Sequence, residues 1–388
     1  MGSEIEFGQS NRALFQLEDG AIYLNHGSYG ATPFGVRDAQ RHWQERLEAE
    51  PSRFMEREFR PALRTAADHL GDFIGAKGPD LVLVENATDA VNAVLNSLSF
   101  SDGDEILTTN QTYNAVKNSV RWTETRNGAQ MKSVDLPFPI NSEEEIVDAF
   151  RSGLNRNTKL VIIDHITSPT ALVLPIERMI EEARKAKALI LIDGAHAPGM
   201  LPLDIEALGV DFYTGNCHKW LFAAKGCAFL WVHPDHQSMI HPTVISHGYG
   251  SGYVNEFDWV GTRDASAQHS LPTAIEFYQE LGDEAIRDHN NTLVREAASE
   301  LAEKWSTRTG APDAMLGSMA MVRLPDGFGH SQEEASKFRA HLLDTYRIQV
   351  PVNALNGGLW VRLSAQIYND LEEYRTLGSA ILTEAAKR

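Results

Sequence analysis

Short runs of consecutive apolar residues alternate with amphipathic stretches through the first two thirds of this 388-residue chain. A strand that is buried on both faces is apolar at every position, whereas a half-buried strand alternates between apolar and polar residues. The apolar runs span residues 81–84, 105–108, 160–163, 188–192, 212–213 and 227–232. Helical patterns lie between them at 88–100, 115–125, 143–154 and 176–187. This alternation predicts an α/β fold with a mainly parallel sheet covered by helices on both faces.

The pattern changes near residue 265, where we place a domain boundary. A long helical stretch, a strand, a helix, a second strand and a final helix follow, at 283–307, 319–324, 331–346, 359–363 and from Asp370. We therefore expect an N-terminal arm (1–20), a large α/β domain (21–265) and a smaller C-terminal α+β domain (266–388). Residues 35–74 have a helical pattern, which we expect Pro61, Gly71 and Gly75 to interrupt.

Charge and composition narrow the class of protein. The net charge is −18, from 35 basic and 53 acidic residues, which argues against a nucleic-acid or an anionic membrane partner. No run approaches the ~20 apolar residues of a membrane helix, and the N-terminus lacks the pattern of a signal peptide. The cysteines, Cys217 and Cys227, form neither a disulfide framework nor a zinc pattern, and no set of residues suggests a metal site. We expect a cytoplasmic enzyme.

The chemistry of the chain is concentrated after two neighbouring apolar runs. Asp193-Gly-Ala-His196 follows the run 188–192, and Lys219 lies in the segment Asp211–Trp220. Ligands of open α/β sheets bind at the carboxyl ends of the strands. A lysine, an acid and a histidine placed there suit pyridoxal 5′-phosphate (PLP), because the lysine holds the aldehyde as a Schiff base and the acid keeps the pyridine nitrogen protonated.

Each of these residues also has a structural interpretation. Lys225, six residues on, is the rival Schiff-base lysine, although its place at the entry to the next strand favours a structural role. Asp193 could instead cap a turn. His196 could be a structural histidine, but its spacing from Asp193 lets both face one ligand, and we expect it near the phenolic oxygen of PLP.

Two further strand ends carry candidates. The segment Glu85–Thr88 follows the run 81–84 and opens a helix, so its amides and the Thr88 hydroxyl suit a phosphate; Thr88 as a simple helix N-cap is the alternative. Tyr113 follows the run 105–108 and can stack on a pyridine ring. The segment Gly248–Gly252 follows no clear strand, which argues against an NAD-dependent dehydrogenase.

Together these segments resemble the class V branch of fold-type I PLP enzymes. The most specific are residues 193–198, 211–220 and 261–264, and the similarity runs from about residue 23 to 369. Within the branch, the chain is most similar to the isopenicillin N epimerase group and its C–S lyase relatives.

The resemblance implies a homodimer with active sites at the subunit interface and a small amino-acid substrate. It assigns Lys219 to the internal aldimine and Asp193 to the ring nitrogen. It implies a phosphate site made of Ala87, Thr88, Asn216 and His218, with Thr262 contributed by the partner subunit, and it puts Tyr113 on the ring. Arg362 is expected to pair with the substrate α-carboxylate, and we expect substrate contacts from Asn25 and His26.

The chain departs from the family at two places that bear on its reaction. Ser168 stands where many relatives have an asparagine near the cofactor phenolate, so we expect it to substitute. No cysteine lies on a mobile loop, which argues against a desulfurase.

We expect epimerisation at Cα through Lys219, with β-elimination by a C–S lyase as the alternative and transamination less favoured. Epimerisation usually needs a second base, for which His26, Tyr29 and Cys217 are the candidates. A catalytically silent PLP-binding protein is disfavoured by the complete set of Lys219, Asp193 and Arg362.

Overall fold

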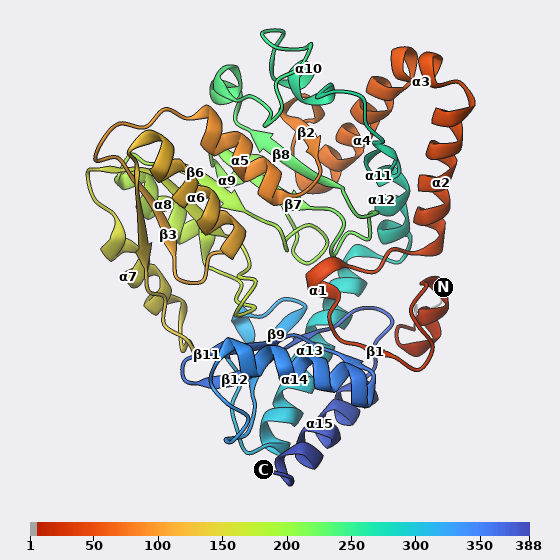
Figure 1. The fold of residues 1–388 in the computed structure, drawn as a ribbon, viewed down its shortest axis with the longest axis vertical. Coiled ribbons are helices and arrows are strands. Elements are labelled where there is room, and N and C mark those ends of the chain that lie inside the picture. Colours follow the sequence, from red (N-terminus) through yellow and green to blue (C-terminus); the bar gives the residue numbers. More distant parts are fainter. Residues whose placement is uncertain (1–5) are drawn as a thin grey trace.

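A seven-stranded sheet forms the centre of the computed structural model, which describes residues 6–388 (Figure 1). Its strands, in spatial order, are β2 (Leu81–Val84), β8 (Ala228–Val232), β7 (Phe212–Asn216), β6 (Leu189–Asp193), β5 (Thr158–Asp164), β3 (Glu105–Thr109) and β4 (Gln130–Val134). Only β8 runs antiparallel to its neighbours. The predicted α/β fold with a mainly parallel sheet is confirmed.

Helices cover both faces of this sheet, which explains the apolar runs in the sequence. Alternate residues of one strand enter different hydrophobic cores: Leu160 and Ile162 pack with α5 (Ala87–Ser97) and α6 (Asn114–Asn127), while Val161 and Ile163 face the opposite side. That opposite core includes residues of α4 (Phe59–Ile74), α7 (Glu143–Gly153), α8 (Ile176–Lys185) and α9 (Ile205–Leu208). Burial on both faces explains why the central positions of β5 are apolar at every residue.

The C-terminal part of the chain builds a second sheet below the first in Figure 1. Its strands are β11 (Val352–Leu355), β12 (Gly358–Ser364) and β9 (Met319–Arg323), all antiparallel. The helices α13 (Asp283–Lys304), α14 (Gln332–Tyr346) and α15 (Leu371–Ala385) pack around it. Between the two sheets in sequence lie α10 (Tyr253–Asp258), α11 (Ser266–His269) and α12 (Leu271–Glu280).

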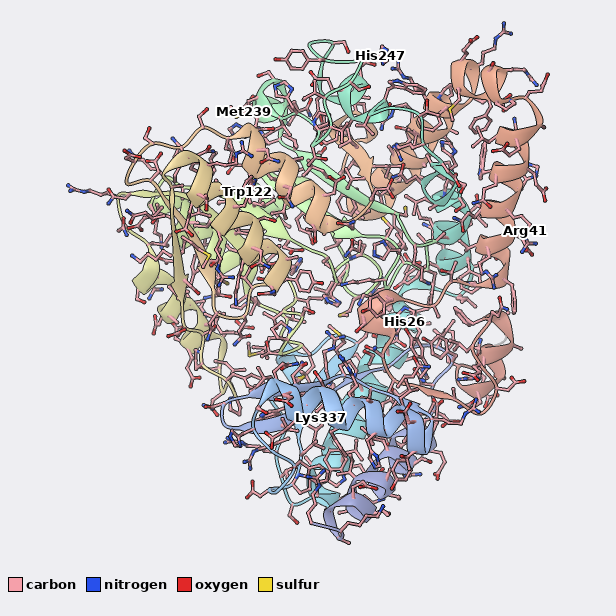
Figure 2. The ribbon with its side chains drawn as sticks, viewed as in Figure 1. His26, Arg41, Trp122, Met239, His247 and Lys337 are labelled. Carbon is pink, nitrogen blue, oxygen red and sulfur yellow. The ribbon has the colours of Figure 1, made fainter. Side chains whose placement is uncertain are left out.

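The N-terminal segment connects the two sheets. Strand β1 (Ile22–Tyr23) pairs in parallel with β10 (Ile348–Gln349), so it joins the C-terminal part of the chain. The short helix α1 (His26–Tyr29) follows, and the labelled His26 lies in the interior between the two parts of the molecule (Figure 2). The domain boundaries at residues 20 and 265 stay predictions.

The helical stretch 35–74 divides at other places than the sequence suggested. It forms α2 (Phe34–Ala49), α3 (Pro51–Arg57) and α4 (Phe59–Ile74), with breaks at Glu50 and Glu58. Pro61 does not interrupt the region, because it lies in the first turn of α4, where a missing N–H costs nothing. Gly71 lies inside α4, whereas Gly75 ends it with left-handed backbone (φ 65°).

Strand β4 was not foreseen because it lies at the sheet edge, where several of its residues are exposed and its sequence is mixed. The short strands β1, β10 and β11 were also missed. No helix within residues 6–388 has the length and apolar character that crossing a bilayer requires.

Candidate active site

A cavity of about 400 Å³ opens at the carboxyl ends of the parallel strands. Asp164, Asp193 and Asn216 are the last residues of β5, β6 and β7, and all three line it. The structure brings nine of the predicted site residues to this cavity: Ala87, Thr88, Tyr113, Ser168, Asp193, His196, Asn216, His218 and Lys219. Residues separated by up to 132 positions in sequence thus share one cavity because parallel strands end at the same edge.

Lys219 projects into this cavity from the turn after β7. Its Nζ lies 3.2 Å from Nε2 of His196. Desolvation, aided by the charge on Arg362 and opposed by Asp193, lowers the pKa of Lys219 from 10.5 to about 7. A large fraction of the amine is therefore unprotonated at neutral pH, as a nucleophile or a base requires.

Two carboxylates lie side by side at the end of the sheet. Asp164 and Asp193 are register partners on β5 and β6, and both are buried. Burial raises both pKa values, that of Asp164 to about 8, to which the neighbouring Asp193 also contributes. Asp193 accepts a hydrogen bond from the N–H of Ala195 (3.0 Å) and faces the amine of Lys219, so it is the member that stays ionised.

Asp164 is a site residue that the sequence analysis missed. Its Oδ2 is buried and has no hydrogen-bond partner in the part of the chain that the structure describes. A signal was present, because Asp164 ends the apolar run 160–163 as Asp193 ends the run 188–192. Since two adjacent buried carboxylates cannot easily both ionise, Asp164 holds the proton below about pH 8.

The two histidines of the cavity are held neutral by their surroundings. His196 accepts a hydrogen bond at Nδ1 from the indole of Trp220 (3.3 Å), and burial lowers its pKa. His218 donates from Nδ1 to the carbonyl oxygen of Cys227 (2.9 Å), and burial lowers its pKa to about 4. The second nitrogen of His218 is left to face a ligand.

The N-terminus of α5 forms one wall of the cavity. Its N-cap is Asn86, whose side chain accepts from the N–H of Asp89 (3.0 Å). The alternative role of Thr88 as N-cap is therefore wrong, and Thr88 instead lines the cavity. Asn216 accepts from the N–H of Ala87 (2.9 Å), which fixes the helix start against the end of β7. A helix N-terminus with a hydroxyl and a histidine beside it suits a phosphate.

Arg362 reaches the same region from β12 of the second sheet. Its Nη1 donates to the carbonyl oxygen and the hydroxyl of Ser168 (2.7 and 3.2 Å), and its Nη2 donates to the Ser28 hydroxyl (2.8 Å). Burial lowers its pKa to about 10, so it stays protonated at neutral pH. Its Nε is buried without a partner in residues 6–388. A cation with an unused donor beside the cavity suits a carboxylate.

His26 and Asn25 do not line the cavity. The ring of His26 is fully buried, and its nitrogens bond to the Tyr368 hydroxyl (2.7 Å) and the carbonyl oxygen of Lys219 (2.9 Å). The expected substrate contact of His26 is thus replaced by a contact that positions the lysine backbone. Asn25 contacts the site through its side-chain oxygen, which accepts from the hydroxyl of the lining residue Ser28 (2.5 Å) and from Nη2 of Arg362 (3.5 Å).

Thr262 is exposed and does not line the cavity of its own chain, so its predicted contribution to a partner's site stays a prediction.

The three candidates for a second base differ in their access to the cavity. Cys217 and His26 are both fully buried, and neither lines the cavity. Tyr29 does line the cavity, and it is 70% exposed.

The residues present fit the PLP that the sequence predicts. The cavity combines one desolvated amine, a buried carboxylate, a helix N-terminus for the phosphate and an aromatic side chain, Tyr113.

The sequence profile described as aminotransferase class-V matches residues 22–373. The chain belongs to the class V aminotransferase family. Its relatives within this family are PLP-dependent enzymes. An L-cysteine desulfhydrase of Arabidopsis thaliana is 35% identical over 95% of this chain and 89% of its own length. The isopenicillin N epimerase of Amycolatopsis lactamdurans is 32% identical over 95% of this chain and 96% of its own.

Among solved structures, a variant of C-DES with glycine covalently linked to its PLP cofactor has a similar fold. The TM-score is 0.80 at 21% identity, over 95% of this chain and 98% of that one. This class V family member therefore shares its fold with a PLP enzyme.

Proposed function

We propose that this class V family member is a PLP-dependent C–S β-lyase that acts on L-cysteine or a cysteine S-conjugate. The observation that carries the proposal is the single desolvated amine, Lys219, facing the cavity with a pKa of about 7. β-Elimination requires one base at Cα, and Lys219 is sufficient for it. Two of the three candidates for a second base, His26 and Cys217, lie outside the cavity.

PLP, when bound, supplies an electron sink that stabilises negative charge at Cα of an amino acid. Lys219 would hold the cofactor covalently, and its amine is the group placed to take the Cα proton. Asp193 would provide the negative charge that matches a protonated ring nitrogen. Arg362 would bind the α-carboxylate and so orient the Cα–H bond. His218, Asn216 and the α5 N-terminus would hold the phosphate.

The relatives support this order of preference. An L-cysteine desulfhydrase at 35% identity matches the proposed bond cleavage, and it covers nearly the same length of this chain as the epimerase. From the sequence we expected epimerisation. Both reactions begin with removal of the same proton, and we now favour elimination because two of the three candidates for a second base lie outside the cavity.

Epimerisation is the second candidate function. Tyr29 lines the cavity and can serve as the second acid or base that reprotonation from the opposite face needs. The isopenicillin N epimerase at 32% identity supports it. Transamination remains a less favoured third reaction, since no residue of the cavity singles it out.

We further propose that the enzyme is a cytoplasmic homodimer with shared active sites. The exposed Thr262 and the 48% exposed Tyr113 support an interface at the mouth of the cavity.

The test of the reaction is a single incubation of the PLP-loaded protein in deuterated water with L-cysteine, S-conjugates and other L-amino acids. We expect pyruvate, ammonia and a released sulfur product. A D-amino acid carrying deuterium at Cα would establish the epimerase and contradict the lyase. Chiral mass spectrometry distinguishes the two products.

A further inference from the structure

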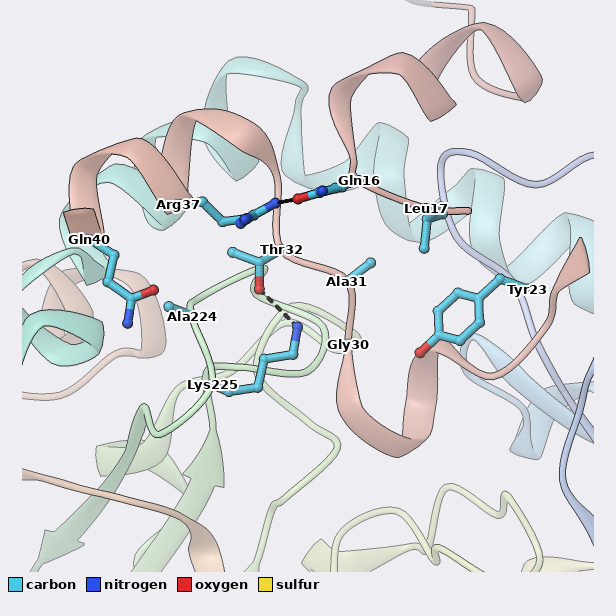
Figure 3. Close-up of a pocket in the computed structure, with 10 residues that line it drawn as sticks. All are labelled: Gln16, Leu17, Tyr23, Gly30, Ala31, Thr32, Arg37, Gln40, Ala224 and Lys225. Carbon is cyan, nitrogen blue, oxygen red and sulfur yellow. Dashed lines mark hydrogen bonds between the residues drawn. The ribbon is translucent and has the colours of Figure 1, made fainter. Parts of the chain in front are cut away.

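A second cavity lies behind the lysine turn, on the other side of the segment that follows α1. Its volume is about 400 Å³, and its walls come from the N-terminal segment, the start of α2 and the loop before β8 (Figure 3). The chain after α1 runs between the two cavities. A Cβ at Gly30 (φ 69°) would collide with the carbonyl oxygen of His218, so this wall packs directly against the catalytic turn.

Two cations face this second cavity. Arg37, in the first turn of α2, donates to the side-chain oxygen of Gln16, and Lys225 donates to the Thr32 hydroxyl (2.9 Å). Figure 3 shows Arg37 directed toward Gln16 and Lys225 directed toward Thr32. Although much of the Lys225 side chain is exposed, desolvation at its amine and the charge on Arg37 lower its pKa to about 8.

No carboxylate balances these charges. The lining residues are neutral apart from Arg37 and Lys225, and within residues 6–388 neither cation forms a salt bridge. This is notable in a chain with a net charge of −18. The positive end of the α2 helix dipole adds to the same potential. Two cations that repel each other in one cavity are stabilised by an anion placed between them.

Several neutral polar groups also line this cavity. Burial raises the pKa of Tyr23 to about 12, with a smaller opposing effect from the charge on Arg362, so the hydroxyl stays protonated at neutral pH. Gln16, Gln40 and the Tyr23 hydroxyl can donate hydrogen bonds to an anion.

We infer that this cavity is an anion site, formed by Arg37 and Lys225, that binds a small carboxylate or phosphate next to the catalytic lysine. The anion is one that is free in solution, because the segment at Gly30 packs between this cavity and the catalytic turn. The site itself does not rest on the proposed lyase function.

The first experiment is calorimetric titration of the PLP-loaded protein with succinate and with inorganic phosphate, because the bound cofactor then fills the catalytic phosphate site. We expect saturable binding of at least one probe, weakened about tenfold or more in Arg37→Gln and in Lys225→Gln, since each removes a charge-assisted hydrogen bond. Arg41→Gln is the matched control, because Arg41 lies one turn further along α2 and pairs with Asp38 outside the cavity. It should bind as the wild type does.

Absence of binding of both probes, or equal binding by wild type and both variants, would overturn the anion site. A change of sedimentation coefficient in the variants would also overturn it, because the two cations would then serve a contact between copies of the chain.

The second experiment tests whether the wall separates the two cavities. It compares kcat/KM for L-cystine, which has a far carboxylate, with kcat/KM for S-methyl-L-cysteine, which has none. We expect parallel values in the two variants, and a selective loss with L-cystine would overturn the assignment to a free anion. If the wild type cleaves neither compound, the lyase proposal fails while the calorimetric result stands.

Discussion

Lys219 combines a low pKa with a fixed backbone, and both properties come from its neighbours. Desolvation favours the neutral amine, and His26 holds the Lys219 carbonyl oxygen from a fully buried position. Lys225 lies only six residues away but faces the second cavity. The two lysines therefore have different roles that their spacing alone does not reveal.

Replacement of Lys219 tests this division. We expect Lys219→Ala to abolish covalent retention of PLP after borohydride reduction and to lower turnover by at least about 10²-fold, because the base is lost. Intact-mass measurement reads the attachment. Lys225→Ala is the control and should retain the cofactor; attachment that survives in Lys219→Ala and disappears in Lys225→Ala would assign the role to Lys225.

The pH dependence of Lys219 follows from its pKa. In the cofactor-free protein the neutral fraction of the amine rises as pH passes through about 7, rather than near the usual 10.5. Acylation of Lys219 by a limiting reagent, followed by peptide mass spectrometry, should therefore reach half its maximal rate near pH 7. In the denatured chain the same lysine should still be gaining reactivity at pH 9, because its pKa returns toward the usual 10.5. Identical profiles for the folded and the denatured protein would contradict the desolvated environment.

Arg362 carries the predicted recognition of the α-carboxylate. We expect Arg362→Lys to raise KM for amino acids about tenfold or more, with a smaller change in kcat. The planar guanidinium of Arg362 donates to Ser28 and Ser168 and can also bind a carboxylate through two N–H groups, which a single ammonium cannot do. Arg323→Lys on the neighbouring strand β9, a half-buried position whose side chain pairs with Asp326, is the control. Unchanged kinetics in Arg362→Lys would remove this residue from the substrate site.

At the scale of elements, the strand register decides which charges meet. The pairing of β5 with β6 puts Asp164 opposite Asp193, and both strands end at the cavity. A one-residue shift would turn one of these side chains to the other face of the sheet. The carboxylate pair is thus a property of two strands together.

The pairing of Asp164 with Asp193 predicts how the stability of the folded protein depends on pH. The folded-state pKa of Asp164, about 8, lies above its unfolded value of 3.8. The free energy that protonated Asp164 adds to the stability of the folded state is therefore fully present below about pH 4 and is lost as pH rises through 8. Asp164→Asn keeps a neutral side chain, so we expect the cofactor-free variant to gain Tm relative to wild type at pH 8 more than at pH 5. The exposed Asp148→Asn should show no such difference. A pH-independent change in Tm would contradict a raised Asp164 pKa.

At the scale of the whole molecule, the site needs contributions from both sheets. Lys219 and Asp193 come from the ends of the large sheet, whereas Arg362 comes from β12 of the small one. Helix α1 lies at the junction, where Ser28 bonds to Arg362. Movement of one sheet relative to the other would therefore separate the cofactor site from the carboxylate site.

The proposed shared active sites predict complementation between subunits. Lys219→Ala removes the base, and Thr262→Asp introduces a charge that repels a phosphate in the partner's site. Mixed dimers of these two inactive variants should recover one intact site out of two, measured as turnover after subunit exchange. Activity no higher than that of the unmixed variants, or a monomer in sedimentation, would contradict sharing.

The sequence by itself determined the α/β class, the cofactor and most of the residues at the strand ends. It did so because buried parallel strands are apolar throughout, and functional residues must stand where those runs stop. The positions of Lys219 and Asp193 follow from this local rule, whereas Asn216 was expected from the resemblance to the class V branch. Asp164 obeys the same rule and was overlooked.

Only the tertiary structure decided which side chains face the cavity and which lie behind it. His26 is close to Ser28 and Tyr29 in sequence, yet its ring points to Tyr368 and the Lys219 backbone. Lys225 and Arg37 are 188 positions apart and meet across one cavity. Sequence patterns report burial and periodicity along one element, whereas these relations depend on the packing of several elements, which no local pattern encodes.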